Sequence, residues 1–495
     1  MNVYARCSMK LRGQLSFRLF GTATADVQSV VKIINDHPFP RQPLWPVLLE
    51  KLPPGTLSGA VVEDVLGRLF SAHCNGLKAL ELFRYASDHS PGNLTPGSFE
   101  KTLHILSRMR YFDKAWELMR EVSKSHPTLL TLKSMSILLS KIARYRSFEE
   151  TLVAFETMEN EVFKGRIFGT DEFNVLLRAL CAERKIKEAR SVFNKLHPRF
   201  KPDVKTMNIL LLGFKESGDI TSVELFYHEM VRRGFTPNSG TYGIRIDTYC
   251  KRGCLGDGLR LLEEMERAGC LVTVQTMTTL IHGAGVARNV IKARELFKRV
   301  HDRNMEPDTG CYNAMMSTVI RLRDIDGALS LMDEMVEKGI KHDNMTYHTM
   351  YLGLMKSKGV ESVCELYHKM IDRNFVPKTR TVVMLMKFFC INCRFDMGLH
   401  LWEYTVTKGH CPHAHALDLL VTGLGSRGRT SEAYACAIQM LERGRQITES
   451  TMQTLQNLLS QAGETEKQRS LNEMVKKLQE FLPASTQDAR KLLFT

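Results

Sequence analysis

The chain has 495 residues, of which 43% are hydrophobic and 25% are charged, and this balance excludes disorder of the whole chain. Lysine and arginine (68) exceed aspartate and glutamate (54) by 14, so the net charge favours a polyanionic partner, either nucleic acid or an anionic membrane. The longest apolar runs, such as residues 209–212, are too short to span a bilayer, and we expect a soluble protein with no membrane partner.

Residues 1–25 have the character of an organelle transit peptide. They contain basic residues, several serines and threonines and no acidic residue before Asp26, and a helix through Leu11, Leu15 and Leu19 would have one apolar edge. We expect a mitochondrial matrix location, with the chloroplast as the alternative, and a cleavage signal near residues 18–20. A disordered basic tail is the other interpretation of this segment.

Residues 26–59 are expected to be a lead-in and linker to the rest of the chain. Six prolines fall between residues 36 and 58, and they exclude a long helix because each one removes a backbone donor and clashes with the preceding turn. These prolines are Pro38, Pro40, Pro43, Pro46, Pro53 and Pro54.

From residue 60 to residue 462 the sequence repeats with a period of about 35 residues. Four kinds of residue recur in register, which a bias in composition cannot produce. The columns are small residues at Ala79, Ala115, Ala189, Ala293, Ala328 and Ala433; methionine at Met230, Met265, Met335, Met370 and Met440; glycine at Gly234, Gly269, Gly339, Gly409 and Gly444; and proline at Pro202, Pro237, Pro307, Pro377 and Pro412.

Each repeated unit is predicted to form two antiparallel helices. In unit 204–238, one apolar face covers residues 207–214, Gly218 interrupts it, and a second apolar stripe covers residues 223–230 before a glycine and a proline end the pattern. A single hairpin of this size cannot bury its own apolar faces, so successive hairpins must stack. The sequence therefore predicts an all-α fold, an α-solenoid of about 11 helix-turn-helix repeats.

Residues 463–495 are expected to close the array with a capping helix and a short tail. A single apolar stripe supports the helix and consists of Leu471, Met474, Val475, Leu478 and Leu482.

The repeated unit resembles that of the pentatricopeptide repeat family, in its P class of plant organelles. The resemblance rests on the 35-residue period, the phrase PDVKTMN at 202–208, the cysteines Cys181 and Cys250, and the Glu-Met pairs that end at Met230, Met265 and Met335. Tetratricopeptide arrays are the nearest alternative, but their period is 34 residues. The terminal Pro-Asp and the basic excess also argue against them.

The resemblance implies a right-handed superhelix that binds single-stranded RNA on its concave side, one base per unit. Two side chains are then expected to read each base, the fifth and the last of a unit. An Asn carboxamide offers a donor and an acceptor to the edge of a pyrimidine, whereas a Ser or Thr hydroxyl leaves room for a purine. The last residue orients the fifth or completes the contact through water.

Carried over to this sequence, these positions imply a short RNA core, 5′-U-Y-N-G-U-3′, from unit 170–203 to unit 309–343. The matched pairs are Asn174 with Asp203 (U), Asn208 with Asn238 (pyrimidine), Thr278 with Asp308 (G) and Asn313 with Asp343 (U), and Ser136 with Gly169 is a weaker match. Four pairs depart from the family pattern and assign no base: Gly243 with Thr273, His348 with Lys378, Val383 with His413, and Asp418 with Thr448.

A further column places a basic side chain near the end of the first helix. The resemblance implies a phosphate contact there, and the alternative is a solvated helix end, where the helix dipole favours a basic residue in any case. The candidates are Arg108, Arg144, Lys251, Arg321 and Lys356.

Patterns for metal or nucleotide chemistry are weak. The GLGSRG run at 423–428 follows a predicted helix, whereas a dinucleotide fingerprint must follow a strand. A zinc site is opposed by Cys390, which falls in the packing column of Cys181 and Cys250. The zinc candidates are Cys390, Cys393, His410, Cys411, His413 and His415. We expect reduced thiols, no metal, no cofactor and no enzymatic activity.

The sequence thus predicts a monomeric RNA-binding protein of organellar RNA processing that acts without catalysis by occupying a short RNA segment. Intron splicing and transcript maturation or stabilisation fit this mechanism, with other RNA-processing factors as further partners. The contrasting hypothesis is a helical-repeat scaffold that binds a peptide or protein in its groove.

Overall fold

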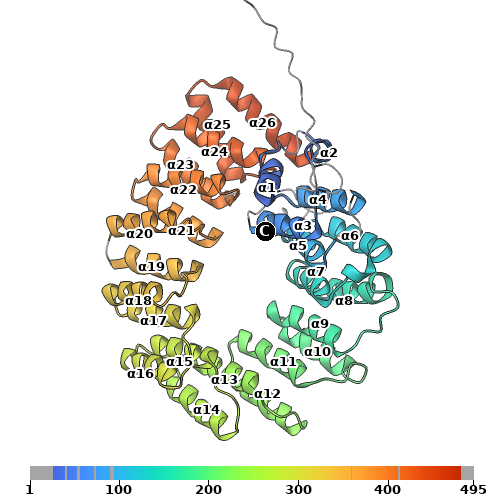
Figure 1. Ribbon diagram of the computed structural model, residues 1–495, viewed down its shortest axis with the longest axis vertical. Coiled ribbons are helices and arrows are strands. Elements are labelled where there is room, and N and C mark those ends of the chain that lie inside the picture. Colours follow the sequence, from blue (N-terminus) through green and yellow to red (C-terminus); the bar gives the residue numbers. More distant parts are fainter. Residues whose placement is uncertain are drawn as a thin grey trace, which may run out of the picture.

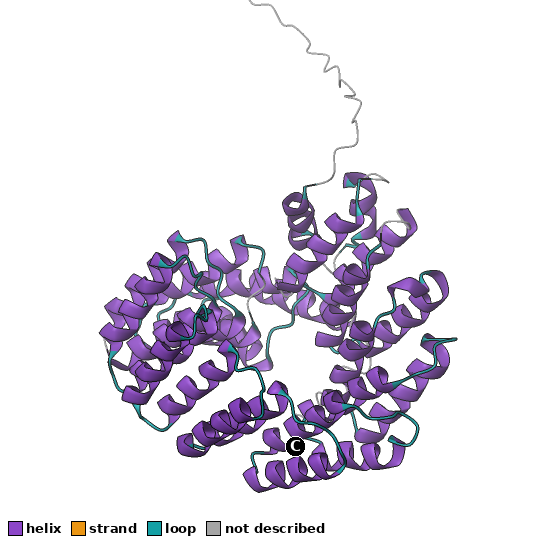
Figure 2. Ribbon diagram, turned by 60° about the horizontal axis from the view of Figure 1, so that its bottom comes forward, coloured by secondary structure: helices purple, strands orange, loops and turns teal. Residues whose placement is uncertain are grey.

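The structure is a computed structural model that describes residues 26–38, 42–52, 56–71, 74–89, 94–357, 359–410 and 413–480. The expected transit peptide, the tail after residue 480 and the candidates Cys411 and Pro412 lie outside these residues. Every regular element in the described ranges is helical, as Figure 2 shows, so the prediction of an all-α solenoid is confirmed. None of these described helices has the length and apolar character that a bilayer span needs.

The helices form hairpins that stack side by side, and the first helix of each hairpin lies on the inner side of the array (Figure 1). These first helices are α1 (Val27–Asp36), α3 (Gly59–Ser71), α5 (Pro96–Arg108), α7 (Leu132–Tyr145), α9 (Thr170–Ala182), α11 (Val204–Ser217), α13 (Ser239–Lys251), α15 (Val274–Val286), α17 (Thr309–Arg321), α19 (Asn344–Ser357), α21 (Thr379–Ile391), α23 (Ala414–Gly425) and α25 (Glu449–Gln461).

The second helices form the outer side of the array (Figure 1). They are α2 (Trp45–Lys51), α4 (Gly76–His89), α6 (Phe112–Ser125), α8 (Phe148–Thr157), α10 (Ile186–Leu196), α12 (Ile220–Arg232), α14 (Leu255–Arg267), α16 (Val290–Asp302), α18 (Ile325–Glu337), α20 (Val360–Asp372), α22 (Phe395–Thr407), α24 (Thr430–Glu442) and α26 (Thr465–Glu480). A 3-10 turn η2 (Pro127–Leu129) follows α6, and a π-helical turn η3 (Met158–Val162) extends α8 in the stretched unit 132–169.

The recurring Pro-Asp/Asn-x-x-Thr phrase starts a first helix. Asp203 is the N-cap of α11, where its carboxylate accepts from the Thr206 amide at 2.7 Å, while the Thr206 hydroxyl accepts from the Asp203 amide at 3.1 Å. Asn238 with Thr241 repeats this reciprocal capping at α13. A side-chain cap satisfies backbone donors that the helix leaves without a partner, so this short phrase fixes where the helix begins.

The recurring glycine ends the second helix. Gly234, Gly269, Gly339, Gly409 and Gly444 all have a positive φ, between 68° and 84°, a left-handed conformation that suits glycine because it has no Cβ. The alanine and methionine columns are buried between hairpins, and Ala293, Ala328, Met265 and Met335 are each 0% exposed. These columns therefore set the stop and the packing face of every second helix.

A second column of small residues, not anticipated from the sequence, brings the first helices close together. A Cβ added to Gly283 of α15 would lie 2.6 Å from Cys250 Cβ and 3.2 Å from its Cα on α13. Gly213 of α11 meets Cys181 in the same way, at 2.7 Å from Sγ. Burial raises the pKa of Cys250 to about 12, so its thiol is a neutral packing group.

Two pairs of the described units exchange the two sides of this contact, α15 with α17 and α23 with α25, where a Cβ added to Gly425 would lie 2.6 Å from Leu458 Cδ1. In α15 the glycine is Gly285, at the place that Cys250 has in α13, and Thr318 of α17 is opposite it, with Oγ1 2.3 Å from the position of an added Cβ. The Thr318 hydroxyl donates to Ala314 O at 2.9 Å, which satisfies it in this buried place. A small residue thus faces a larger one in both versions of the contact.

The segment expected as a lead-in contains two further helices. Helix α1 packs along α3, and the short α2 packs along α4. Pro46 lies in the first turn of α2, where a missing backbone donor is tolerated, and this is why the proline content did not prevent a short helix. At the other end α26 packs on α24 and α25 and buries Leu471, Met474 and Leu478.

Substituting Gly283 by valine should destabilise the array by about 1–3 kcal/mol, because the added atoms meet the backbone of Cys250 and neither helix can retreat without disturbing the next hairpin. The urea midpoint of the far-UV circular dichroism signal measures this. Gly256→Ala is the matched control, since a Cβ there has no neighbour within 4 Å in its helix α14, and it should be neutral or stabilising by up to about 1 kcal/mol. Equal midpoints for the two variants would contradict the close-approach argument.

Candidate nucleic-acid interface

The inner face carries pairs of polar side chains from consecutive units. The fifth residue lies in the first turn of one first helix, and the last residue of the unit is the N-cap of the next. Asn208 Nδ2 donates to Asn238 Oδ1 at 3.1 Å, and Asn313 Nδ2 donates to Asp343 Oδ1 at 3.1 Å. Residues 30 positions apart therefore form one polar group, because the first helices stack closely.

A buried threonine completes each of these pairs. The Thr241 hydroxyl donates to Asn208 Oδ1 at 2.8 Å, and the Thr346 hydroxyl donates to Asn313 Oδ1 at 2.9 Å. Both threonines are 0% exposed. A carboxamide has two N–H donors and two acceptor lone pairs, so each Asn is held in one orientation and still has one donor and one acceptor for a ligand.

Two carboxylates of the pairs, Asp203 and Asp343, have pKa values below the ordinary aspartate value. Burial raises the pKa of Asp343, but hydrogen bonds from the Thr346 amide and the Asn313 carboxamide outweigh this and lower the pKa below its ordinary value. For Asp203, burial is likewise outweighed by hydrogen bonds from the hydroxyl and amide of Thr206, and its pKa is lowered. The caps therefore keep their negative charge and contribute their stability down to pH values below the ordinary aspartate range.

Two predicted reading residues have polar atoms without a hydrogen-bond partner. Asn174 is 2% exposed and neither its Nδ2 nor its Oδ1 makes a hydrogen bond of normal geometry, although its carboxamide is near enough to lower the pKa of Asp203. Thr278 Oγ1 is also buried and makes no hydrogen bond of normal geometry, although it is near enough to the Cys311 thiol to offset part of the pKa rise that burial causes there. Asp308 caps α17 by accepting from the Cys311 amide at 2.8 Å. An unpaired buried polar group costs about 1–3 kcal/mol, which a ligand that pairs with it removes.

The weaker match, Ser136 with Gly169, is not a polar pair. Gly169 has no side chain, and α9 is capped instead by Glu172, whose Oε2 accepts from the Gly169 amide at 2.8 Å. Ser136 is half-buried in α7. Only one hydroxyl is therefore present at this step of the ladder.

Both ends of the array have carboxylates in the fifth position, and the two at the N-terminal end were not identified in the sequence analysis. Glu63 accepts from the Thr95 hydroxyl at 2.6 Å, and Glu100 accepts from the Thr131 hydroxyl at 2.6 Å. At the other end Asp418 accepts from Thr448. A carboxylate offers acceptors only and repels phosphate, so the first two units and unit 414–448 are poorly suited to a nucleic-acid base. The register of the first units, counted from Gly59 and Pro96, was the signal that could have found them.

Glycine leaves two of the pairs uncovered. A Cβ added to Gly240 would lie 3.2 Å from Asn238 Oδ1 and 3.4 Å from Asn208 Nδ2, and one added to Gly310 would lie 3.2 Å from Asp308 Oδ1. The second residue of a unit thus borders the polar pair formed by the preceding unit. In these two units a planar ligand can approach the pair without meeting a side chain there.

The candidate phosphate contacts differ in their surroundings. Arg144, Arg321 and Lys356 are exposed, and no carboxylate of the described residues lies within ion-pair distance of them. Lys251 is ion-paired with Asp247 at 3.0 Å. Arg108 is half-buried, with Nη1 2.8 Å from Phe70 O and its guanidinium 4.7 Å from the centre of the Phe70 ring. Burial, and then the charge of Arg445, lower the pKa of Arg108 to about 10.

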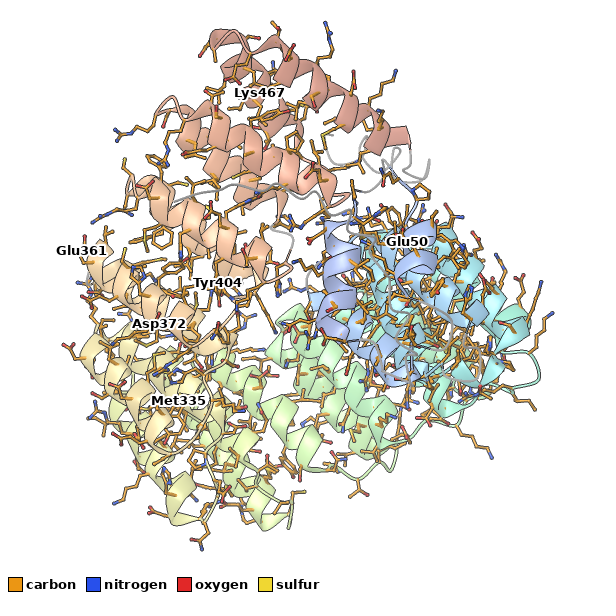
Figure 3. The ribbon with its side chains drawn as sticks, turned by 45° about the horizontal axis from the view of Figure 1, so that its top comes forward. Glu50, Met335, Glu361, Asp372, Tyr404 and Lys467 are labelled. Carbon is orange, nitrogen blue, oxygen red and sulfur yellow. The ribbon has the colours of Figure 1, made fainter. Side chains whose placement is uncertain are left out.

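Lys251 belongs to a charge network that the single basic column did not reveal. Asp247 also pairs with Lys215 of α11 at 2.6 Å, and both lysines lower the pKa of this carboxyl against the effect of burial. On the outer side, ion pairs join successive second helices, such as Arg190 with Glu229 at 2.7 Å. Figure 3 shows Glu361, which pairs with Arg394, at the outer edge of the array. These two ion pairs neutralise charges between neighbouring second helices.

A metal site finds no support in the described part of the chain, which holds no cluster of three histidine, cysteine or acidic side chains. Cys390 packs near Gly423, where an added Cβ would be 3.4 Å from its sulfur, and burial raises its pKa to about 11. Because zinc is bound by a thiolate, a half-buried neutral thiol in this packing position is poorly placed as a ligand.

Comparison with known proteins agrees with the repeat architecture. A model described as PPR repeat family matches residues 202–251 and 307–356. A pentatricopeptide repeat domain model matches residues 260–321, and a PPR repeat model matches residues 173–197 and 240–270. Among solved structures, the chain is similar to the pentatricopeptide repeat protein PPR10 from maize, with 20% identity, 92% of this chain and 72% of that chain covered, and a TM-score of 0.35. The chain is also similar to PPR10 in complex with an 18-nt psaJ RNA element, with 19% identity, 85% of this chain and 61% of that chain covered, and a TM-score of 0.42.

Two curated relatives from Arabidopsis thaliana are more similar in sequence. A putative pentatricopeptide repeat-containing protein is 32% identical over 425 residues, which cover 86% of this chain and 85% of the relative. A pentatricopeptide repeat-containing protein is 56% identical over 460 residues, which cover 92% of both chains. At that identity over nearly the whole length, the chain belongs to the pentatricopeptide repeat family.

Proposed function

We propose that this protein binds single-stranded RNA along the inner face of the array and acts in mitochondrial RNA processing by occupying a short RNA segment. The observation that carries the proposal is the ladder of pre-oriented side-chain pairs, of which Asn208–Asn238 and Asn313–Asp343 each keep one donor and one acceptor for a base. Membership of the family supports it, since pentatricopeptide arrays read one base per helical repeat. The net charge of +14 favours the same class of ligand.

The proposed core target is 5′-U-Y-N-G-U-3′, read by units 170–203 to 309–343. Gly243, in the middle of this stretch, offers no side chain, which is why the third base is unspecified. With about 1–3 kcal/mol for each stacked and paired base, four specified positions suffice to hold a short segment against a weak RNA hairpin. Binding would keep the segment single-stranded or shield it from nucleases without any chemical step.

The mitochondrial assignment rests on relatives and on the expected transit peptide. Several similar Arabidopsis thaliana proteins are named as mitochondrial pentatricopeptide repeat-containing proteins, including one that is 26% identical over 88% of this chain. Intron splicing, or transcript maturation and stabilisation, is the step that occupancy of a short segment serves, together with other RNA-processing factors. Crosslinking in isolated mitochondria and sequencing of the attached RNA would identify the transcript.

A second candidate is a protein-binding scaffold. One relative, 20% identical over 72% of this chain, is the small ribosomal subunit protein mL103 of Arabidopsis thaliana, so related arrays are found in a large assembly. This hypothesis predicts binding that is insensitive to substitution of Asn208 or Asn313 and that persists at high salt.

Asn313→Ala should weaken binding of an RNA that carries UUAGU by roughly fivefold to 150-fold, because it removes the carboxamide donor and acceptor that are proposed to read the fifth base, a U. Fluorescence anisotropy at fixed salt measures the affinity. Asn194→Ala, at an exposed position of the outer helix α10, is the control and should leave the affinity unchanged. If both variants bind equally well, the inner ladder does not read RNA.

Thr278→Asn should change the preferred fourth base from G to U, since it recreates beside Asp308 the pair that Asn313 forms with Asp343. The measurement compares the affinities of four RNAs that differ only at this base. For the wild type we expect at least about fivefold preference for G, which corresponds to the net value of one hydrogen bond. Equal affinity of the wild type for all four RNAs would refute the assignment.

Arg321→Ala and Lys356→Ala should each reduce the slope of log affinity against log salt by about 0.7, the value for loss of one phosphate contact on a single strand. The slope is obtained from titrations at several KCl concentrations. Lys298→Ala, on the outer helix α16, should leave it unchanged. If the slope is unchanged in all three variants, Arg321 and Lys356 do not contact phosphate and are solvated residues at helix ends.

A further inference from the structure

The two ends of the array meet, and two asparagine side chains each donate a hydrogen bond across the meeting point. Asn35 Nδ2 at the end of α1 donates to Gly409 O at 3.1 Å, and Asn75 Nδ2 before α4 donates to Gly444 O at 2.7 Å. The partners are 374 and 369 residues apart in sequence. Figure 1 shows α1 and α3 beside the last hairpins, so that the array returns to its own start. We refer to the contact made by these four residues as the seam.

The two acceptors occupy equivalent places in consecutive units. Gly409 and Gly444 follow α22 and α24, and both are in the left-handed conformation, with φ of 79° and 71°. Their amides close the helix ends on Val406 O and Leu441 O, and their own carbonyl oxygens point beyond the last turn. The repeat therefore presents the same free acceptor twice, and an asparagine from the first hairpins meets each.

Buried groups hold the two donors in place. Lys78 Nζ, with the side chain 1% exposed, donates to the carbonyl oxygens of Ile34 at 2.9 Å, Asn35 at 3.3 Å and His37 at 2.9 Å, and so fixes the last turn of α1. Asn75 is 1% exposed, and its Oδ1 accepts from the Leu77 amide at 2.9 Å at the start of α4. Each asparagine is thus oriented by its own hairpin before it reaches across.

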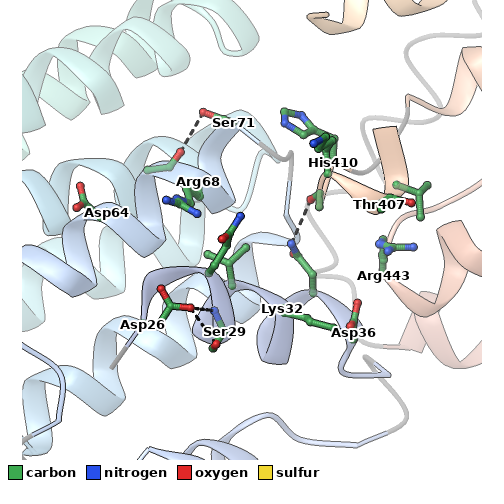
Figure 4. Close-up of a pocket in the computed structure, with 17 residues that line it drawn as sticks. Asp26, Ser29, Lys32, Asp36, Asp64, Arg68, Ser71, Thr407, His410 and Arg443 are labelled. Carbon is green, nitrogen blue, oxygen red and sulfur yellow. Dashed lines mark hydrogen bonds between the residues drawn. The ribbon is translucent and has the colours of Figure 1, made fainter. Parts of the chain in front are cut away.

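The seam encloses a polar cleft of about 1120 Å³ between α1, α3 and residues 406–410, with Arg443 on its wall (Figure 4). The packing beside the first hydrogen bond is close, because a Cβ added to Gly409 would be 3.1 Å from Asn35 Nδ2 and 4.0 Å from Val31 Cγ1. Both seam hydrogen bonds join neutral groups. The walls of the cleft bear charges of both signs, including Asp26, Asp36 and Asp64 on the N-terminal side and Lys408 and Arg443 on the C-terminal side.

We propose that the seam closes the array into a ring in solution, so that a strand on the inner face is encircled and must enter by threading a free end or while the seam is open. The contacts described above support closure, and closure does not require that the protein binds RNA. The entry of the strand rests on the proposed RNA binding, and the two are tested separately.

Closure is tested in the full-length protein with a benzophenone amino acid in place of Val31. Irradiation should crosslink it to residues 406–410, as detected by mass spectrometry, and the same group in place of Ile167, which is 92% exposed, should give no such crosslink. Combining the probe with Asn35→Ala and Asn75→Ser should reduce the crosslink by at least about tenfold. Ser keeps a capping oxygen for α4 but is too short to reach Gly444.

Asn392→Ala is the matched control, because it removes an Asn Nδ2 bond to a backbone carbonyl (Phe388 O, 2.8 Å) away from the seam, and it should leave the crosslink unchanged. Circular dichroism of each variant checks that the helices persist, and the single variant Asn35→Ala serves if Asn75→Ser unfolds. Absence of the crosslink in the wild-type background, or a yield unaffected by loss of the seam donors, would overturn closure.

Encirclement is tested with an oligoadenylate that carries UUAGU, used as a linear strand and as the same strand ligated into a circle. The wild type should associate at least about tenfold more slowly with the circle, and the Asn35→Ala/Asn75→Ser variant should bind both at equal rates. Equal rates in the wild type would overturn encirclement. If the linear strand does not bind, the proposed RNA binding fails, whereas the crosslink still decides whether the ring closes.

Discussion

The distance between successive first helices is the constraint on which the rest of the structure depends. It is short because a glycine on one helix faces a cysteine or another modest side chain on the next, as Gly283 faces Cys250. At a larger separation the fifth residue of one unit and the N-cap of the next could not share a hydrogen bond. The packing of small residues therefore creates the polar ladder, and without it the same side chains would be isolated groups.

The ladder uses residues that the fold already needs. Asp343 caps α19 through the Thr346 amide, and the same carboxylate orients Asn313. A ligand that meets this pair finds the side chains already ordered, so little conformational entropy is lost at the moment of binding. Asn174 and Thr278 make no hydrogen bond of normal geometry, and this carries an energetic cost in the free protein. Pre-orientation and unsatisfied hydrogen bonds thus favour binding at different steps of one ladder.

Much of the architecture could be predicted from the sequence, because it is local and repeated. Capping phrases, left-handed glycines and buried alanines recur every 35 residues, and each determines a feature within its own hairpin. The pairs Asn208–Asn238 and Asn313–Asp343 followed from the same register and the family resemblance, as did the position of Asn174 on an inner helix. Glu63 and Glu100 lay in that register too, but were not considered because they do not match a reading pattern.

Other features depend on contacts that no local pattern encodes. Arg108 was expected near phosphate, but its guanidinium packs on Phe70 and lies near Arg445, which is far along the chain. The surroundings of Arg108 and the seam both depend on the curvature of the array summed over all its units. A small error in the predicted angle between successive units would therefore misplace them. Helix α2 was missed because seven residues with a proline in the first turn give no periodic signal.

The exchange of Gly285 and Thr318 bears on how this array could be recoded for other targets. At Gly213 and Gly283 the small residue belongs to the later helix of a contact, but here, as at Gly425, it belongs to the earlier one. A unit transplanted across that boundary would bring two small residues together and leave a void, or two larger ones and force the helices apart. In this stretch the two first helices on either side of a contact therefore have to be exchanged together. A change of RNA specificity has to be made in blocks that keep both helices of the contact.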